Sequence, residues 1–223
     1  MKKLFFVLFV SCLASLTYSQ NIRLNAYGSY VFDDKIDNYY SSSRYMQGKI
    51  KGGFMWGAGL EFRAHEYYGI ELLYQRLDTH APMDYWDYNE NKAEHTNFDL
   101  SVNYIMVGGA RSVYHPGSKA EPYGGFMLGM AIMDATNPDK NQSYSATKFA
   151  WGLRGGTNIW ASERVGIKLQ AQLLSIPQGA GGTLYFGTGG AGAGVSTYST
   201  MLQFVLGGGL TFKLGQQSST HHK

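Results

Sequence analysis

Residues 53–63 read Gly-Phe-Met-Trp-Gly-Ala-Gly-Leu-Glu-Phe-Arg and alternate almost residue by residue. From Phe54 onward every second side chain is apolar, whereas Gly57, Gly59, Glu61 and Arg63 lie between them. Successive side chains of a β-strand point to opposite faces, so the alternation predicts a strand with one greasy face and one polar face.

The same alternation recurs in seven other segments of about ten residues, the length with which a tilted strand crosses a bilayer. Eight is also the smallest usual number of strands in a membrane barrel. The period blurs near Ile105 and Met106, where we expect a β-bulge. The seven segments are residues 21–33, 68–78, 97–107, 122–133, 148–160, 164–175 and 200–214.

The connections between these segments alternate in length. Residues 64–67, 115–120 and 161–163 are short connections, whereas residues 34–52, 79–96, 134–147 and 176–199 are expected to be long loops. Outer-membrane barrels have short periplasmic turns and longer outside loops, so both ends of the barrel segment are expected in the periplasm.

Alternation alone leaves open which face is inside. A soluble, lipocalin-like barrel would bury the greasy face, whereas a membrane barrel turns it toward lipid. Small residues such as Gly57, Gly59, Gly125, Gly129 and Gly152 fall on the polar face and suit a narrow lumen. The sequence therefore favours an all-β fold, an eight-stranded antiparallel up-and-down transmembrane β-barrel.

The first residues are typical of a secretory signal. Lys2 and Lys3 precede an apolar run from Leu4 to Leu16, and small residues precede a cut before Gln20. Cys12, the single cysteine, lies inside this run; a lipoprotein cleavage site is the less favoured alternative. We expect residues 1–19 to be a signal peptide, 20–214 the barrel and 215–223 a polar periplasmic tail.

Spaced glycines and aromatic residues occur in residues 103–109, 121–125, 128–129, 149–156 and 207–212. With this pattern the chain resembles the small outer-membrane β-barrel proteins of Gram-negative bacteria, especially of Bacteroidetes-type lineages. The resemblance implies the barrel fold and an outer-membrane location. Unlike such barrels, this chain continues past Phe212 with a polar tail instead of ending at an aromatic residue.

Charged residues on the predicted polar face are expected to point into the lumen, where they must pair because an unpaired buried charge costs several kcal/mol. The favoured interpretation is a plug of salt bridges that stiffens the barrel. A narrow polar pathway, a small ligand site or titratable groups with a catalytic duty are the alternatives. The expected lumen charges are Arg23, Glu61, Arg63, Glu71, Asp99, Arg154 and Lys168.

Motifs for catalysis, cofactors and metals are not found. No histidines have the spacing of a helical zinc pair, and none is expected within a strand. Membrane-embedded lipid enzymes of similar size carry a histidine and a serine together, and no His-x-Ser occurs here. We therefore expect no catalytic residue, cofactor or metal, and a lipid-modifying enzyme is the least favoured function.

Aromatic residues near the predicted strand ends fit interfacial girdles, in which rings lie at the depth of the lipid headgroups. A sugar-stacking site is the less favoured alternative. These residues are Tyr30, Phe32, Tyr67, Tyr68, Tyr114, Tyr123 and Trp160.

The composition limits the partners. Charged residues are 16% of the chain, against about 25% in average proteins, and no basic stripe suggests nucleic acid. We expect a monomer that contacts outer-membrane lipid, the assembly machinery and a partner on an extracellular surface. The predicted role is structural or interactional, including loop display, envelope integrity and adhesion. The alternative is a narrow channel for small solutes, including hydrophobic ones.

Overall fold

The computed structural model describes residues 22–41, 44–87, 92–113, 117–139, 141–177, 183–187, 190–194 and 201–214. The expected signal peptide and polar tail lie outside these residues and stay predictions. None of the described residues forms a helix long and apolar enough to cross a membrane. The strands are β1 (Ile22–Val31), β2 (Asp34–Ser41), β3 (Arg44–Ile50), β4 (Gly53–His65), β5 (Tyr68–Asp87), β6 (Lys92–Ser112), β7 (Ala120–Asn137), β8 (Gln142–Trp160), β9 (Val165–Ile176), β10 (Thr183–Gly187), β11 (Gly190–Gly194) and β12 (Met201–Lys213).

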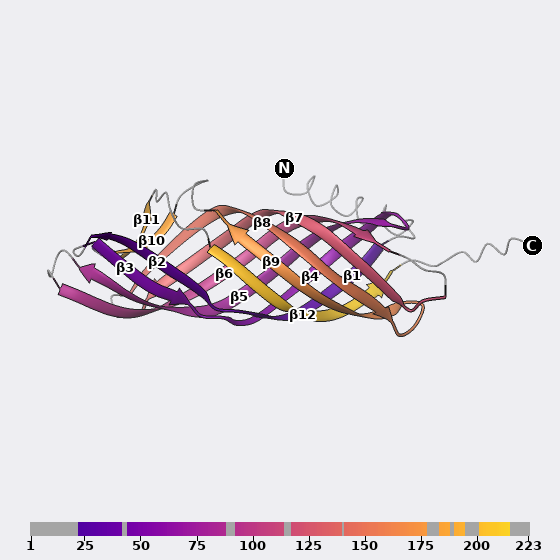
Figure 1. The fold of residues 1–223 in the computed structure, drawn as a ribbon, viewed down its shortest axis with the longest axis horizontal. Coiled ribbons are helices and arrows are strands. Elements are labelled where there is room, and N and C mark those ends of the chain that lie inside the picture. Colours follow the sequence, from indigo (N-terminus) through magenta and orange to yellow (C-terminus); the bar gives the residue numbers. More distant parts are fainter. Residues whose placement is uncertain are drawn as a thin grey trace, which may run out of the picture.

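Eight strands close into a ring in the order β1, β4, β5, β6, β7, β8, β9, β12, and β12 pairs back onto β1. Every neighbouring pair is antiparallel, and the strands are strongly tilted (Figure 1). Arg23 pairs with Lys213, so the first and last strands begin and end at the same end of the barrel. We call this the turn end and the opposite one the hairpin end. The predicted eight-stranded barrel is confirmed.

The expected long loops are wrong in part, because much of each one continues as strand. Residues 34–52 contain the paired strands β2 and β3, and residues 176–199 contain the paired strands β10 and β11. β5 and β6 run for 20 and 21 residues, whereas β1 has only 10. The barrel wall is therefore much taller along β5 to β8 than along β9, β12, β1 and β4.

The outer surface decides between a membrane barrel and a soluble one. Phe54 and Leu72 point outward and are 65% and 55% exposed, and large apolar side chains of all eight ring strands share this surface. Exposed apolar patches of this extent mark a surface that faces lipid or a partner. The greasy face is outside, so the soluble alternative is wrong. We call this surface the apolar belt; it includes Leu24, Trp56, Leu60, Ile70, Val107, Leu128, Phe149, Leu169 and Leu206.

β6 shows why the alternation blurred near Ile105. The register of β6 with β5 and β7 runs without a shift through Ile105 and Met106, so the expected bulge is wrong. Toward the turn end Ile105 and Val107 are exposed, whereas toward the hairpin end Leu100 and Tyr104 are buried. The strand leaves the apolar belt at this point, and apolar residues change from its outer face to its inner face.

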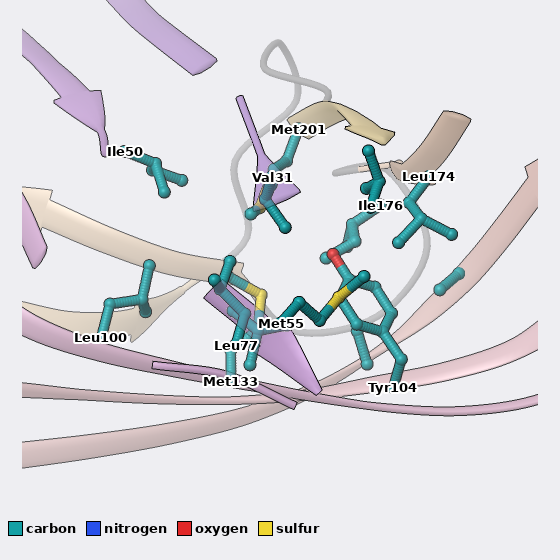
Figure 2. Close-up of a cluster of buried hydrophobic side chains, with 14 of the residues drawn as sticks. Val31, Ile50, Met55, Leu77, Leu100, Tyr104, Met133, Leu174, Ile176 and Met201 are labelled. Atoms are coloured by element: carbon teal, nitrogen blue, oxygen red, sulfur yellow. The ribbon is translucent and has the colours of Figure 1, made fainter. Parts of the chain in front are cut away.

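The interior consequently has two halves of different polarity. The half at the turn end holds charged and amide side chains. In the half at the hairpin end, apolar side chains from all the ring strands form one buried cluster. Figure 2 shows part of this cluster, in which Val31, Met55, Leu77, Leu174 and Met201 come from five different strands.

Candidate functional site

The candidate site is the charged layer that fills the lumen at the turn end. Alternation places six of the seven expected residues on inner faces: one on β1, two on β4 and one each on β5, β8 and β9. All six are buried: Arg23, Glu61, Arg63, Glu71, Arg154 and Lys168.

Asp99 is a correction to the expected set. It lies on the outer face of β6, its side chain is 60% exposed, and its Oδ1 lies 2.9 Å from Nδ1 of His80. The prediction is wrong because Asp99 lies beyond the apolar belt, where the outer face is polar.

Glu71 is the centre of one group in the lumen. Arg154 forms an ion pair with its Oε2, and Asn25 Nδ2 and Tyr27 Oη each donate a hydrogen bond of 2.6 Å to its Oε1. Gly59 on β4 makes room for the carboxylate, because a Cβ there would lie 1.9 Å from Glu71 Oε1. A small residue in the lumen therefore allows the buried carboxylate to pair.

Glu121 is the centre of a second group, and the sequence interpretation missed it. Arg23 Nη1 and Arg63 Nη1 lie 3.0 and 3.2 Å from its Oε1, and Trp160 Nε1 donates to Oε2 over 2.9 Å. The alternation could have revealed it, because Glu121 is separated from Gly125 and Gly129 by an even number of residues and therefore lies on the same face of the strand. It was missed because the strand was taken to start at Pro122.

Several of these contacts cross the whole lumen. β1 and β7 are four strands apart in either direction around the ring, and so are β6 and β12. Arg23 of β1 nevertheless reaches Glu121 of β7, and Tyr104 of β6 donates to Gln203 of β12 over 2.7 Å. Side chains thus span the lumen at two heights.

Two expected girdle residues belong to this layer instead. Tyr123 is 8% exposed and donates to Gln170, and Lys168 Nζ lies 4.9 Å from the centre of its ring. Lys213 Nζ lies 3.8 Å from the centre of the indole ring of Trp160. The prediction that Tyr123 and Trp160 belong to the girdle is wrong, because both side chains lie on the inner faces of their strands. Tyr30, Phe32, Tyr67 and Tyr68 are exposed, and Tyr114 lies outside the described residues.

The outer surface at the hairpin end carries exposed charge pairs. His80 and His95 lie within β5 and β6, against expectation, and each pairs with an aspartate directly across the ladder, Asp99 and Asp84. Lys49 and the Gly52 N–H both bond the carboxylate of Asp33, and they lower the pKa of that carboxyl. Among the described residues, no group of three metal-binding side chains is found.

Chemically, the layer joins four cationic side chains to three carboxylates inside a closed ring. Each carboxylate has at least one cationic partner: Glu61 with Lys168 at 3.5 Å, Glu71 with Arg154 and Glu121 with Arg23. Ion pairs of this kind link different strands of the barrel and fill the lumen between them.

No protein-family model matches the chain, and no curated protein matches it. Solved structures do. Neisserial surface protein A is 12% identical, with a TM-score of 0.55 over 86% of this chain and 96% of that one. Outer membrane protein OprG from Pseudomonas aeruginosa is 12% identical, with a TM-score of 0.53 over 89% of this chain and 97% of that one. The chain therefore has the fold of the small eight-stranded outer-membrane β-barrels.

Proposed function

We propose that the protein is an outer-membrane barrel without a through-pore, which supports the envelope and presents its hairpin end as an interaction surface outside the cell. The cross-lumen contacts carry the proposal. The charged layer fills the half of the lumen at the turn end, and the apolar cluster fills the other half, where ions would lose their hydration.

The orientation follows from the connections. In barrels of this fold the short turns face the periplasm and the longer connections face outside. The paired strands β2 and β3 and the long β5–β6 and β7–β8 hairpins would then stand above the membrane. Their backbones are held in ladders, so they offer fixed surfaces. The likeness to outer-membrane barrels supports the location, and we retain the expected monomer, the assembly machinery and a surface partner as parts of the proposal.

Conductance tests the closed lumen. The purified, folded barrel is added to planar bilayers, with a porin as the positive control and heat-modifiable gel mobility as the check on folding. We expect no discrete current steps, because side chains span the lumen at two heights and the apolar cluster occupies the half at the hairpin end. Reproducible steps from the folded form would contradict the proposal and favour the channel.

A hairpin replacement tests the surface role. Val31 pairs with Gly53 in the β1–β4 ladder, which places Phe32 opposite Gly52, so residues 33–51 can be replaced by Asn-Gly, a two-residue hairpin turn. We expect a folded barrel that keeps the cells resistant to detergent but adheres less to surfaces. Unchanged adherence of cells with this replacement and with a similar truncation of β5–β6 would contradict a role for the hairpins.

A second candidate function is the uptake of small apolar solutes from the hairpin end. The apolar interior of this half favours it, and β8 favours it too: among the described residues its stretch 142–150 pairs with β7 alone. β9 stops at Ile176, before Pro177, which has no N–H to extend the ladder. A solute could leave sideways at this stretch. Binding of decanol at the inner face of the apolar half would support this candidate.

A further inference from the structure

The apolar belt is not equally tall around the barrel. On β6 only three outward positions separate the polar Asn103 from the charged Arg111. On and just after β12, the seven outward positions from Leu202 to Leu214 are all apolar or glycine. With a rise of about 3.3 Å per residue and a strand tilt of about 40°, these spans are about 20 Å and about 30 Å tall. The belt is therefore narrow on β6 and wide on β12.

A hydrogen bond across the lumen places these two strands at a common height. Tyr104 of β6 donates to Gln203 of β12 over 2.7 Å. The next residue toward the hairpin end points outward on each strand: it is Asn103 on β6, and on β12 it is Leu202, which is 47% exposed. At one level the outer surface is thus polar on one side of the barrel and apolar on the opposite side.

Polar contacts with β5 fix the upper limit of the belt on this side. Tyr74 Oη and Arg76 Nη1 donate to Asn103 Oδ1 over 2.9 and 3.4 Å. Arg76 Nη2 lies 2.7 Å from Asp78 Oδ1, and these two side chains are 37% and 58% exposed. An exposed ion pair of this kind is costly in hydrocarbon, so the hydrocarbon ends below Arg76 on β5.

Arg111 marks the limit of the belt at the turn end. It points outward on β6, is exposed, and its guanidinium carbon lies 5.9 Å from the ring centre of Tyr68 on β5. No carboxylate in the described part of the chain pairs with it. Space lies beside it, since a Cβ at Gly109 would meet no atom within 4 Å and one at Gly124 only a carbonyl oxygen at 4.0 Å. A phosphate of a neighbouring lipid could therefore reach the guanidinium.

Tilting the whole barrel does not remove the difference in belt height. A tilt moves both limits of the belt on one side in the same direction, so the height between them is unchanged. β6 and β12 are also four strands apart in the ring, which puts the narrow and wide parts on opposite sides. A membrane protein whose apolar span is shorter than the hydrocarbon is matched by a locally thinner bilayer.

From these positions we propose that the outer face of β5 and β6, which we call the narrow face, thins the bilayer beside it and binds a phospholipid phosphate at Arg111. The hydrocarbon boundary would lie about 5 Å closer to the bilayer centre in each leaflet there than beside β12. The inference goes beyond the proposed function and requires only that the barrel lies in a membrane. It depends neither on the surface role nor on the uptake of solutes.

Nitroxide labels on single cysteines measure the depth of each limit. The full chain carries Cys12→Ser, which removes its single cysteine, and one of the substitutions Asn103→Cys, Val113→Cys or Leu202→Cys. Each protein is folded into vesicles of phosphatidylcholine and phosphatidylglycerol. The accessibility of the label to oxygen and to a water-soluble nickel complex then gives its depth below the local membrane surface.

We expect the label at Asn103 to lie at the headgroups and the label at Leu202 about 5 Å deeper. The label at Val113, beyond Arg111 on the same face, should also lie at the headgroups. Arg111→Leu lengthens the belt by one outward position and should bury the Val113 label by about 5 Å. Lys119→Leu, which removes an exposed lysine at a turn, is the matched control and should leave the label where it was.

Three results would overturn the proposal. Equal depths at Asn103 and Leu202 would show a bilayer of uniform thickness. A shallow label at Asn103 together with a deep one at Val113 would show that the barrel tilts instead. An unchanged Val113 label in Arg111→Leu would overturn the phosphate contact. The comparison of Asn103, Val113 and Leu202 decides the thinning even if Arg111→Leu fails to fold.

Discussion

Glu71 shows what a single buried carboxylate requires in this barrel. It is 0% exposed, and it has Arg154, Asn25 and Tyr27 as partners from two other strands. A buried ion pair adds little over an apolar pair of the same size, but breaking it leaves one charge without compensation. Glu71 therefore stabilises the fold only when its ion-pair and hydrogen-bond partners are present.

Replacing one member of the pair should destabilise the barrel more than replacing both. We expect Arg154→Met or Glu71→Met alone to lower the free energy of unfolding by about 3–5 kcal/mol, and the double variant to recover most of it. Urea unfolding in detergent micelles, followed by tryptophan fluorescence, measures this. If neither single variant changed the free energy of unfolding, the ion pair would be hydrated or would not form.

The seam between β1 and β12 closes the barrel, and at the level of elements it depends on close approach of two backbones. Gly207, Gly208 and Gly209 of β12 pair with Ser29, Gly28 and Tyr27 of β1. A Cβ at Gly209 would lie 1.8 Å from the carbonyl oxygen of Ala26. The glycines are therefore spacing elements, and their absence would force the two strands apart.

Gly209→Ala should accordingly weaken closure, by about 1–3 kcal/mol, the usual cost of overpacking. Gly109→Ala on β6 is the matched control, because a Cβ there has no atom within 4 Å. The fraction of heat-modifiable, folded protein after refolding into detergent measures both. Equal folding yields for the two variants would count against a tight seam.

For the whole molecule, the decisive feature is the height at which the outer face changes polarity. Ala58 lies outward in the middle of β4, between the exposed Trp56 and Leu60. Ser101 lies outward on β6 beyond the belt, next to Asp78 on the neighbouring strand. The same substitution at these two positions should therefore meet lipid in one case and water in the other.

We expect Ala58→Arg to lower the free energy of unfolding in phospholipid vesicles by about 2–4 kcal/mol, the cost of an arginine near the bilayer midplane. Ser101→Arg should cost less than about 1 kcal/mol, since it lies at or above the interface. If the two variants lowered the free energy of unfolding equally, the apolar belt would not mark the part of the barrel that lies in the membrane.

Alternation predicted the eight ring strands, their antiparallel order and the inward side of most charges, because a period of two needs only neighbouring residues. It placed Asp99 on the wrong face of β6, because the outer face of a strand is apolar within the membrane and polar beyond it. It also missed the β2–β3 and β10–β11 pairs, because a short paired segment and a loop have similar compositions. Glu121 was lost through a boundary error of one residue.

By itself, then, the chain determined a barrel with a greasy exterior, since each strand carries its two faces in its own sequence. Only the tertiary structure decided which charges meet, because Arg23 and Glu121 are 98 residues apart and face each other only after closure. Closure also decided that the lumen is polar in one half and apolar in the other. Inner faces acquire a common environment only when all eight strands are set at their final heights.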